Sequence, residues 1–488
     1  MKDVKIKDAP LLEQVSGSEK IPVSDGSGDP KTVSVGQIKA GLATEESVGN
    51  AIEHTTTSIA AHNTSSEAHA DIREGITSAV STHNADEAAH PAIMKSMNTA
   101  FAKRDERILS LEDFVVKNDR SFGIRWSTED TVKTIEYVGN ISLVDKFKDW
   151  VDNSPLPCEI KKDGTDFAYL TNTAGVESST NWLTRADGSS SHYQSDDKAD
   201  YLQMVELKNI NIGFESDETY KTMTVWFNLD EECPHGFHPW FKNGKKLIAR
   251  YDSTFNADGS TIDACYGTTQ PTGNWSFNLA HTQTKATNAN LLNLTAWEII
   301  CLTWIQSAYY KSFDMQTALA GGIQSGSESA ARNYVNGSTD TLTTPHGKIS
   351  SGAFRFMYME NAFWGKQWIM GFGWRGQNGT GYLTFDDVKA NKAATMSLDD
   401  ADVTMSYLTN TNGSYMKNVD FFTMPIEVGG STTSGFYDGN WSNTSNDRIF
   451  YAGGSSGIGA SCGAFARYVD NDASNAYWSR RARCAMNR

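Results

Sequence analysis

The chain has 488 residues, of which 39% are hydrophobic, 21% charged and 11% aromatic. Such a length predicts roughly two to four domains and at least one large core. Its 43 basic and 59 acidic residues give a formal net charge of −16, and an acidic surface repels phosphates, so nucleic acid is not expected as a partner. No stretch reaches the roughly 20 apolar residues of a membrane span, and the opening residues lack an apolar signal region, so we expect neither membrane insertion nor classical secretion.

The six cysteines are too few and too scattered for a disulfide framework, and no two of them form a Cys-x-x-Cys pair. The nearest arrangement to a metal site is Cys233-Pro-His235-Gly-Phe-His238, which lacks a second nearby cysteine. We therefore expect reduced, mostly buried thiols. We expect neither a metal nor another cofactor.

Residues 1–42 predict a small β module. Ile21-Pro-Val23 and Thr32–Val35 read as short strands, and the turn-forming residues between them include Asp25-Gly26, which favours positive backbone angles. A hairpin of this size buries too little apolar surface to be stable alone. We therefore expect the module to need a docking partner or further copies of itself.

Residues 43–118 predict a helical stalk with an internal repeat. A His-Asn-(x4)-Ala-His pattern occurs twice at an offset of 21 residues, which is three heptads. After Pro91 the frame shifts, and apolar residues from Met94 to Val115 follow the spacing of a coiled-coil seam. On one heptad frame the repeat places four histidines on a single stripe: His62, His69, His83 and His90.

A polar helix of that length is stable only against other helices, so we expect a parallel coiled coil. A homotrimer is preferred to a dimer because mixed core residues and wide polar layers suit three strands. The histidines then form layers at the trimer axis, where they either bind a metal or anion or act as hydrated polar layers that fix the register. The second interpretation is favoured, and the helix is expected to break near the His-Asn sites and Pro91.

Residues 119–488 differ in composition, since they hold all thirteen tryptophans. Short strands are predicted at 354–358 and 404–407, among glycine-rich loops. Amphipathic helices are predicted at 142–151 and 294–311, and one face of the second comprises Leu294, Trp297, Ile300, Cys301, Trp304, Ile305 and Ala308. These patterns together indicate one large α+β domain.

Several segments of this domain are similar, in order, to landmarks of one family. They are Leu294–Trp304, Gln316–Gly322, Glu360–Trp368, Gly453-Gly454-Ser455 and Ala464–Cys484. In that order they resemble the C-type-lectin-like domains of phage fibres and diversified phage adhesins, a fold shared with formylglycine-generating enzymes. The Lys-Ile-Lys-Asp opening and the histidine repeat also look like the attachment and stalk segments of phage fibre proteins. The resemblance implies a fibre in which residues 1–42 attach to the virion, 43–118 form the stalk and 119–488 bind a receptor.

The same resemblance bears on catalysis. Formylglycine-generating enzymes carry two copper-binding cysteines a few residues after the Gly-Gly-Ser landmark. This chain has Ile458 and Gly463 at those positions, and Cys462 stands alone beside them. One thiol cannot supply two-thiolate ligation, so the resemblance implies the fold without the activity.

No other catalytic motif is found, including the nucleophile-elbow, phosphate-loop and HExxH patterns. Asp399, Asp400 and Asp402 are conceivable as a glycosidase pair or a calcium site, but a solvated acidic loop is the favoured interpretation. We therefore do not expect an enzyme.

The remaining class of function is recognition. The C-terminal part of the chain carries aromatic residues beside Asn and Ser, a combination used by adaptable binding surfaces. Trp441 and Tyr477 are expected to be the most exposed of these aromatics, whereas Trp364, Trp368, Phe465 and Arg483 are expected to be structural. The candidate ligand-binding residues are Tyr437, Asn440, Trp441, Asn443, Asn446, Asn475, Tyr477 and Trp478.

The resulting expectation is a virion fibre protein, assembled in the host cytoplasm, that binds a host cell-surface glycan or protein. Its partners would be two further copies of itself, other virion proteins through its N-terminus, and the host ligand. The alternative is a capsid-decorating head fibre or structural tail component without direct receptor binding. A fibre-borne depolymerase is the least favoured interpretation.

Overall fold

The computed structural model divides the chain into two compact units, residues 1–107 and 108–488. This division does not test the predicted segments 1–42, 43–118 and 119–488, which remain predictions. The residues that the structure describes are 20–23, 31–34, 53–54, 56–58, 60, 74–78, 120–171, 182–226, 236–242, 244–255, 259–269, 273–318, 334–349, 353–362 and 366–488.

In the first unit, β1 (Lys20–Val23) pairs antiparallel with β2 (Lys31–Ser34). Val23 lies opposite Lys31, so the predicted hairpin is confirmed.

The long coiled-coil stalk of the predicted fold class is wrong for the described part of the chain. The helical residues described between 43 and 118 form only short stretches, at 53–60 with gaps and at 74–78, and their side chains are exposed. Because nothing buries them, no tertiary packing supplements the weak intrinsic stability of short polar helices. His62, His69, His83 and His90 lie outside the described residues.

The predicted α+β, C-type-lectin-like class of the large domain is also wrong. Among the described residues, strands account for 38% and helices for 20%, and the strands form a curled half-barrel. The physical reason is that short apolar runs between Gly, Asn and Ser turns are long enough for strands but too short for helices.

A seven-stranded sheet contains the C-terminus of the chain. Its order is β15-β28-β12-β8-β5-β6-β7, with β15 (Leu292–Asn293), β28 (Cys484–Asn487), β12 (Lys245–Ala249), β8 (Tyr201–Lys208), β5 (Leu156–Lys161), β6 (Phe167–Thr171) and β7 (Thr184–Arg185). The last strand, β28, therefore lies between two strands that precede it by almost two hundred residues or more.

A nine-stranded sheet positions the site described below. Its order is β21-β20-β19-β25-β26-β24-β22-β23, with β27 paired to β19. The bounds are β21 (Val403–Ser406), β20 (Thr380–Leu383), β19 (Trp368–Gln377), β25 (Arg448–Ala452), β26 (Arg467–Val469), β24 (Gly439–Ser442), β22 (Thr411–Val419), β23 (Pro425–Val428) and β27 (Arg480–Arg481).

A five-stranded sheet and two small ones complete the described strands. The five-stranded sheet has the order β11-β9-β10-β3-β4, with β11 (Phe237–Pro239), β9 (Asn211–Ser216), β10 (Tyr220–Trp226), β3 (Ser121–Ser127) and β4 (Glu136–Gly139). The small sheets are β13 (Thr254–Phe255) with β14 (Ile262–Asp263), and β16 (Gly347–Lys348) with β17 (Phe354–Phe356) and β18 (Met359–Glu360).

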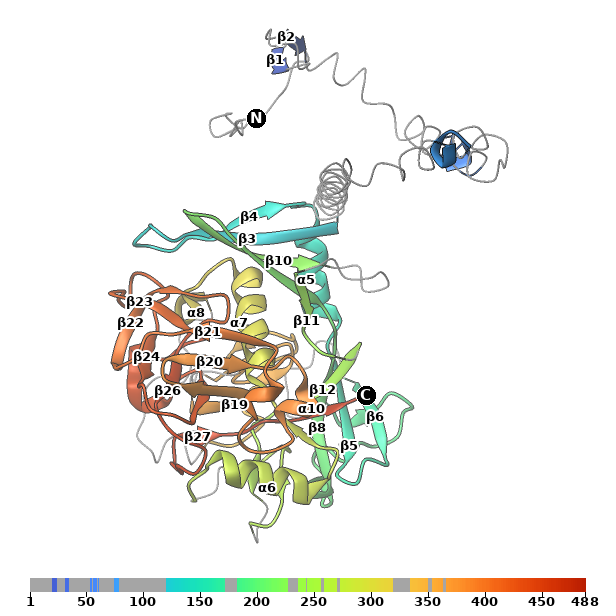
Figure 1. Cartoon of the computed structure of the whole chain (residues 1–488). Coiled ribbons are helices and arrows are strands. Elements are labelled where there is room, and N and C mark those ends of the chain that lie inside the picture. The colour runs from blue at the N-terminus through green and yellow to red at the C-terminus, as the bar shows by residue number, and fades with distance from the viewer. Residues whose placement is uncertain are drawn as a thin grey trace. The chain divides into compact units, whose positions relative to one another are not determined.

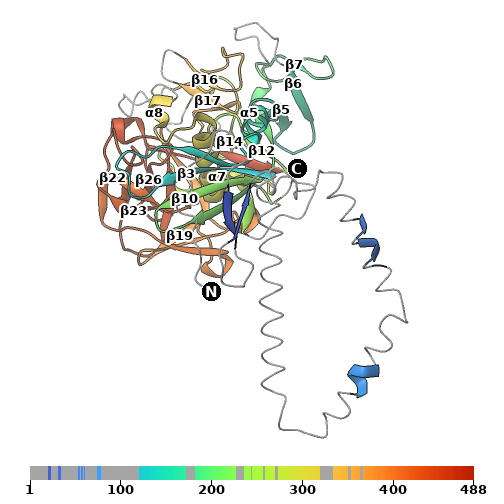
Figure 2. The same ribbon diagram turned by 90° about the horizontal axis from the view of Figure 1, so that it is seen from above.

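The helix α7 (Ala296–Tyr310) confirms the helix predicted at 294–311, but not its one-sided character. Thr295 and Glu298 form a capping box at its start, and every residue from 296 to 308 is buried. It packs against β19, and Figures 1 and 2 place it between the β5–β8 side of one sheet and the β22–β26 side of another. Because its residues are buried on all sides, α7 is the centre of the core.

The other helices lie nearer the surface. The predicted amphipathic helix at 142–151 is confirmed as α5 (Leu143–Asn153), whose buried residues fall on one face. The rest are α6 (Phe277–Thr287), α8 (Met315–Ala318), α10 (Asp387–Ala390) and the 3-10 turns η1 (Lys198–Asp200), η2 (Leu398–Asp400) and η3 (Ser456–Ser461). In the part of the chain that is described, no helix combines the length and apolarity of a membrane span.

Candidate functional site: an aromatic pocket beside β19 and β27

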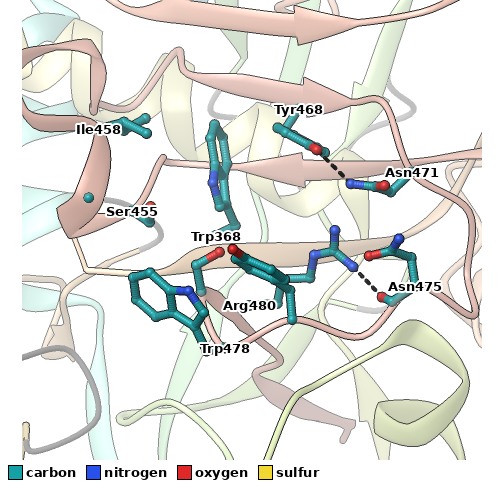
Figure 3. Close-up of a pocket in the computed structure, with 11 residues that line it drawn as sticks. Trp368, Ser455, Ile458, Tyr468, Asn471, Asn475, Trp478 and Arg480 are labelled. Atoms are coloured by element: carbon teal, nitrogen blue, oxygen red, sulfur yellow. Dashed lines mark hydrogen bonds between the residues drawn. The ribbon is translucent and has the colours of Figure 1, made fainter. Parts of the chain in front are cut away.

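A surface pocket of about 500 Å³ lies where β19, β26 and β27 meet the loops of the C-terminal tail. It is lined by Trp368, Ser455, Gly457, Ile458, Tyr468, Asn471, Asn475, Tyr477, Trp478, Ser479 and Arg480. In Figure 3, Ser455 and Ile458 lie on one side and Asn471 and Asn475 on the other, with Trp368 and Arg480 between them. We call this the aromatic pocket.

The floor of the aromatic pocket is set by a short parallel strand pair. Trp368 of β19 is the register partner of Arg480 of β27, and Ile369 is the partner of Arg481. The backbone N–H of Trp368 donates to the carbonyl of Ser479 over 2.7 Å. Because side chains alternate along a strand, Trp368 and Arg480 share the pocket side while Ile369 and Arg481 face the interior.

An aromatic cluster holds the indole of Trp368 in place. The ring centroid of Trp368 lies 5.4 Å from that of Trp441 and 5.4 Å from that of Tyr468. The Asn471 side-chain amide donates to the Tyr468 hydroxyl over 2.6 Å. The rings support each other by packing, so the pocket wall is rigid without a ligand.

Tyr477 and Trp478 are presented by a fixed stretch of backbone. The N–H of Tyr477 donates to the carbonyl of Trp275 over 2.9 Å, and the N–H of Trp275 donates back over 3.2 Å. The carbonyl of Trp478 accepts from the side-chain amide of Gln367 over 2.6 Å. With the backbone held on both sides, the Tyr477 side chain remains 51% exposed at the pocket rim.

The loop from Asn471 to Asn475 forms the opposite wall. The Asp472 carboxylate accepts hydrogen bonds from the N–H of Ser474 over 2.8 Å and from the N–H of Asn475 over 3.1 Å. Its hydrogen bonds with Ser474 hold the pKa of Asp472 below its ordinary value. A carboxylate that satisfies two successive N–H groups is a local turn former, so the loop is ordered by its own sequence.

The Gly453-Gly454-Ser455 segment turns the chain from β25 into η3. Gly454 has a φ of +76°, and a Cβ atom there would lie 2.7 Å from the sulfur of Cys462. Only glycine meets both demands. The turn places Ser455 and Ile458 at the pocket, while Cys462 is buried and donates to the Gly453 carbonyl over 3.0 Å.

Of the described residues that line the pocket, Arg480 alone is charged. It is 5% exposed, and its guanidinium lies 4.7 Å from the ring centre of Tyr451. Its Nη1 donates to the carbonyl of Asn475. No carboxylate of the described residues comes within 4.0 Å of it, since it takes part in none of their ion pairs.

The chemistry of the lining suits binding more than proton transfer. The described residues of the lining offer aromatic faces, hydroxyl and amide groups and one guanidinium, but no Asp, Glu, His or Cys. General acid–base chemistry mostly uses those missing residue types. Within the described ranges, no three His, Cys, Asp or Glu side chains gather as a metal site requires.

The structure separates the eight predicted ligand-binding residues. Three of them, Asn475, Tyr477 and Trp478, line the aromatic pocket. Asn440 is instead fully buried, and its side-chain nitrogen donates to Thr411 within the fold. The remaining four are Tyr437, Trp441, Asn443 and Asn446, which are exposed or half-buried but not part of the lining.

Trp441 is half-buried behind Trp368, and Tyr477 is exposed as expected. Trp368, Phe465 and Arg483 are buried, in agreement with their predicted structural role, and Trp364 lies outside the described residues. The five described cysteines are buried thiols, as predicted. Cys233 and His235 lie outside the described residues.

Sequence reasoning missed the other eight residues that line the pocket, which are Trp368, Ser455, Gly457, Ile458, Tyr468, Asn471, Ser479 and Arg480. Trp368 has the packing role that the sequence predicts, and it also lines the pocket. Tyr468 and Asn471 lie in the same aromatic and Asn-rich tail as the residues that were selected, so composition contained a signal for them. Nothing in the local sequence distinguishes Arg480, because four arginines lie close together at the end of the sequence and none of them stands out.

Comparison with known proteins leaves the site to be interpreted from its geometry, because no family model and no curated protein sequence matches this chain.

Proposed function

We propose that the chain binds a sugar residue of a host cell-surface glycan in the aromatic pocket, as the adhesive component of a virion fibre. The observation that carries the proposal is the combination of aromatic side chains with hydroxyl and amide groups around one cavity of about 500 Å³. That volume falls in the range of about 300–1,000 Å³ that is common for small-ligand sites.

Sugars have the matching chemistry. A pyranose ring has an apolar C–H face that packs on an aromatic ring, and hydroxyls around its edge that both donate and accept hydrogen bonds. Trp368 and Trp478 offer the aromatic surface, while Ser455 and Asn475 offer the polar groups. A few placed polar groups on an apolar wall fix the orientation of a ligand.

The pocket is also prepared for a ligand in advance. Its walls are held by the Tyr477–Trp275 backbone pair and the Asp472 turn. Ordering a loop or a long side chain on binding costs free energy, roughly 0.5–1.5 kcal/mol for each side chain. A wall that is ordered beforehand avoids that cost.

The virion setting, the attachment through the N-terminal residues and the homotrimeric state belong to the same proposal. Their support is the likeness of the opening segment and the histidine repeat to phage fibre proteins. Light scattering on the intact chain tests self-association. A particle of three times the 53.6 kDa chain mass is expected, and a monomer would contradict this part.

The binding proposal is tested with the full chain on a panel of immobilised mono- and oligosaccharides, followed by titration of the best binder with tryptophan fluorescence as the readout. Trp478→Ala is expected to weaken binding by about tenfold, because it removes an aromatic face of the pocket. Tyr220→Ala is the matched control, since Tyr220 is a partly exposed aromatic on β10 and is not part of the lining.

Tyr220→Ala should bind like the unmodified chain. The proposal fails if no saccharide of the panel binds, or if Trp478→Ala binds the best saccharide as tightly as the unmodified chain does.

A further inference from the structure

We infer that the aromatic pocket selects an acidic sugar, whose carboxylate pairs with the guanidinium of Arg480. The inference rests on the proposed function and names the class of sugar. It follows from the position of Arg480, which lies at the floor of the pocket beside Trp368.

The first step is the burial of a permanent cation. Arg480 is 5% exposed, and arginine keeps its charge at all ordinary pH values. Burying a charge is costly unless an opposite charge compensates it. The Asn475 carbonyl and the rings of Tyr451 and Tyr477 compensate only in part, because they carry dipoles or quadrupoles and no net negative charge.

Other buried arginines of this domain show what compensation looks like. Arg250 lies 2.8 Å from the carboxylate of Asp340, and Arg483 lies 2.7 Å from that of Asp252. Arg467 has no such ion pair among the described residues, but it donates to Thr423 and to the carbonyls of Ala464 and Ala466. Arg480 differs from all three because it lines a pocket.

The second step concerns the unused donors. A guanidinium has five N–H groups in a planar fork. Among the described residues, the one hydrogen bond of the Arg480 side chain is that of Nη1 to the Asn475 carbonyl. The fork therefore retains donor capacity on the side of the cavity, and a planar carboxylate is the group that an arginine fork matches best.

The third step is the pairing of charge with a stacking surface. Trp368 and Arg480 are neighbours across the β19–β27 pair, and their side chains share one side. An acidic sugar carries its carboxylate on a ring carbon, directly beside the C–H face of the ring. One such residue can thus contact the indole and the guanidinium together, with Ser455 and Asn475 within the same lining for its hydroxyls.

Because the net charge of the chain is negative, a preference for an acidic sugar requires a local cation. With a formal charge of −16, the whole protein repels an anion at long range. Salt screens such long-range repulsion over roughly 8 Å at physiological ionic strength. A contact ion pair inside the aromatic pocket acts at shorter distance, so the preference for an acid depends on Arg480 itself.

The test compares matched sugars on the full chain. The probes are the methyl glycosides of glucuronic acid, galacturonic acid and N-acetylneuraminic acid, each beside its carboxyl-reduced counterpart, titrated by tryptophan fluorescence and calorimetry. At least one acid is expected to bind about 10- to 100-fold more tightly than its reduced form, which is the range for a charge-assisted pair. Arg480→Gln should bring the two forms to nearly equal affinity.

Two variants complete the test. Arg480→Lys keeps the charge and should retain part of the preference, while Arg125→Gln removes one exposed cation outside the pocket and should leave it unchanged. Near-ultraviolet circular dichroism checks that each variant is folded. If Arg480→Gln is not folded, the comparison of acid with reduced sugar on the unmodified chain still decides.

The possible failures are distinct. Equal binding of acid and reduced sugar by the unmodified chain, with both weakened by Trp478→Ala, would overturn the acidic preference and leave the sugar site intact. A preference that persists in folded Arg480→Gln would also overturn it. Absence of binding by every acidic and neutral sugar would instead refute the proposed function.

Discussion

Two neighbouring arginines on β27 have opposite surroundings, although both are buried. Arg481 points inward and pairs with the carboxylate of Asp252, whereas Arg480 points to the aromatic pocket and has no carboxylate partner among the described residues. Alternation along a strand is sufficient to separate them. A difference of one position along the strand thus separates a cation that holds the fold together from a cation that is available to a ligand.

The inward side contains an ion cluster, which we define as Asp252, Lys366, Arg481 and Arg483. Asp252 lies 2.7 Å from Arg483 and 3.7 Å from Lys366, and it is in direct contact with Arg481. Burial alone would raise the pKa of Asp252, but the nearby charges of Arg481, Arg483 and Lys366 outweigh it and hold that pKa below its ordinary value. Burial lowers the pKa of Lys366 to about 7.

The largest effect is expected from Asp252→Asn. This change removes the one carboxylate that three buried cations share, and breaking a buried pair from one side costs about 3–5 kcal/mol of unfolding free energy. Denaturant titration measures the loss. The control is Glu136→Gln, which breaks an exposed pair with Arg125 and should cost less than about 1 kcal/mol.

If Asp252→Asn loses no more stability than Glu136→Gln, the ion cluster does not hold the fold, and the contrast between the two arginines disappears.

A smaller effect separates the arginines directly. Arg481→Gln removes a charge-assisted hydrogen bond to Asp252 and should lower the unfolding free energy by roughly 1.5–3 kcal/mol. Arg480→Gln removes one hydrogen bond to a carbonyl together with an uncompensated buried charge, so its cost should be about 1 kcal/mol or less. Thermal and urea unfolding of both variants, side by side, measure the difference. Equal losses would show that Arg480 is structural, like its neighbour.

A further expected effect is a pH dependence that originates away from both arginines. Burial raises the pKa of Asp438 to about 8 from 3.8, so the folded chain keeps this proton where the unfolded chain has released it. Its contribution to stability is therefore greatest below about pH 4 and declines as the pH rises towards 8. Asp438→Asn should flatten the fall in unfolding free energy across that window, as measured by urea titrations at several pH values. An unchanged slope would contradict the assignment.

Local sequence patterns were sufficient for some elements. The hairpin of β1 and β2 follows from turn residues between two short strands, and α5 follows from apolar residues spaced along one helical face. The helix at 296–310 was also predictable from its capping box and apolar content. Each of these signals lies within about 15 residues of sequence, the range over which periodicity and capping act.

Contacts between distant segments were not predictable. The β27–β19 pairing joins Arg480 to Trp368, and β28 enters a sheet beside β12. The helix at 294–311 was expected to be amphipathic, with its apolar residues on one face, because the sequence cannot show that sheets cover the other faces of α7. The α+β class was wrong for a related reason: short apolar runs are long enough for strands, but they form strands only beside partner strands, which the sequence does not show.

By itself, the sequence determined the local elements, the acidic charge, the buried thiols and an aromatic tail suited to recognition. Only the tertiary structure decided which of the tail residues share a cavity, because strand register and side-chain alternation set the side on which each one lies. Three of the eight predicted ligand-binding residues line the aromatic pocket, whereas Asn440 is buried inside the fold. The difference between Arg480 and Arg481 has the same origin: they are adjacent in the chain, and the pleat of β27 turns them to opposite sides.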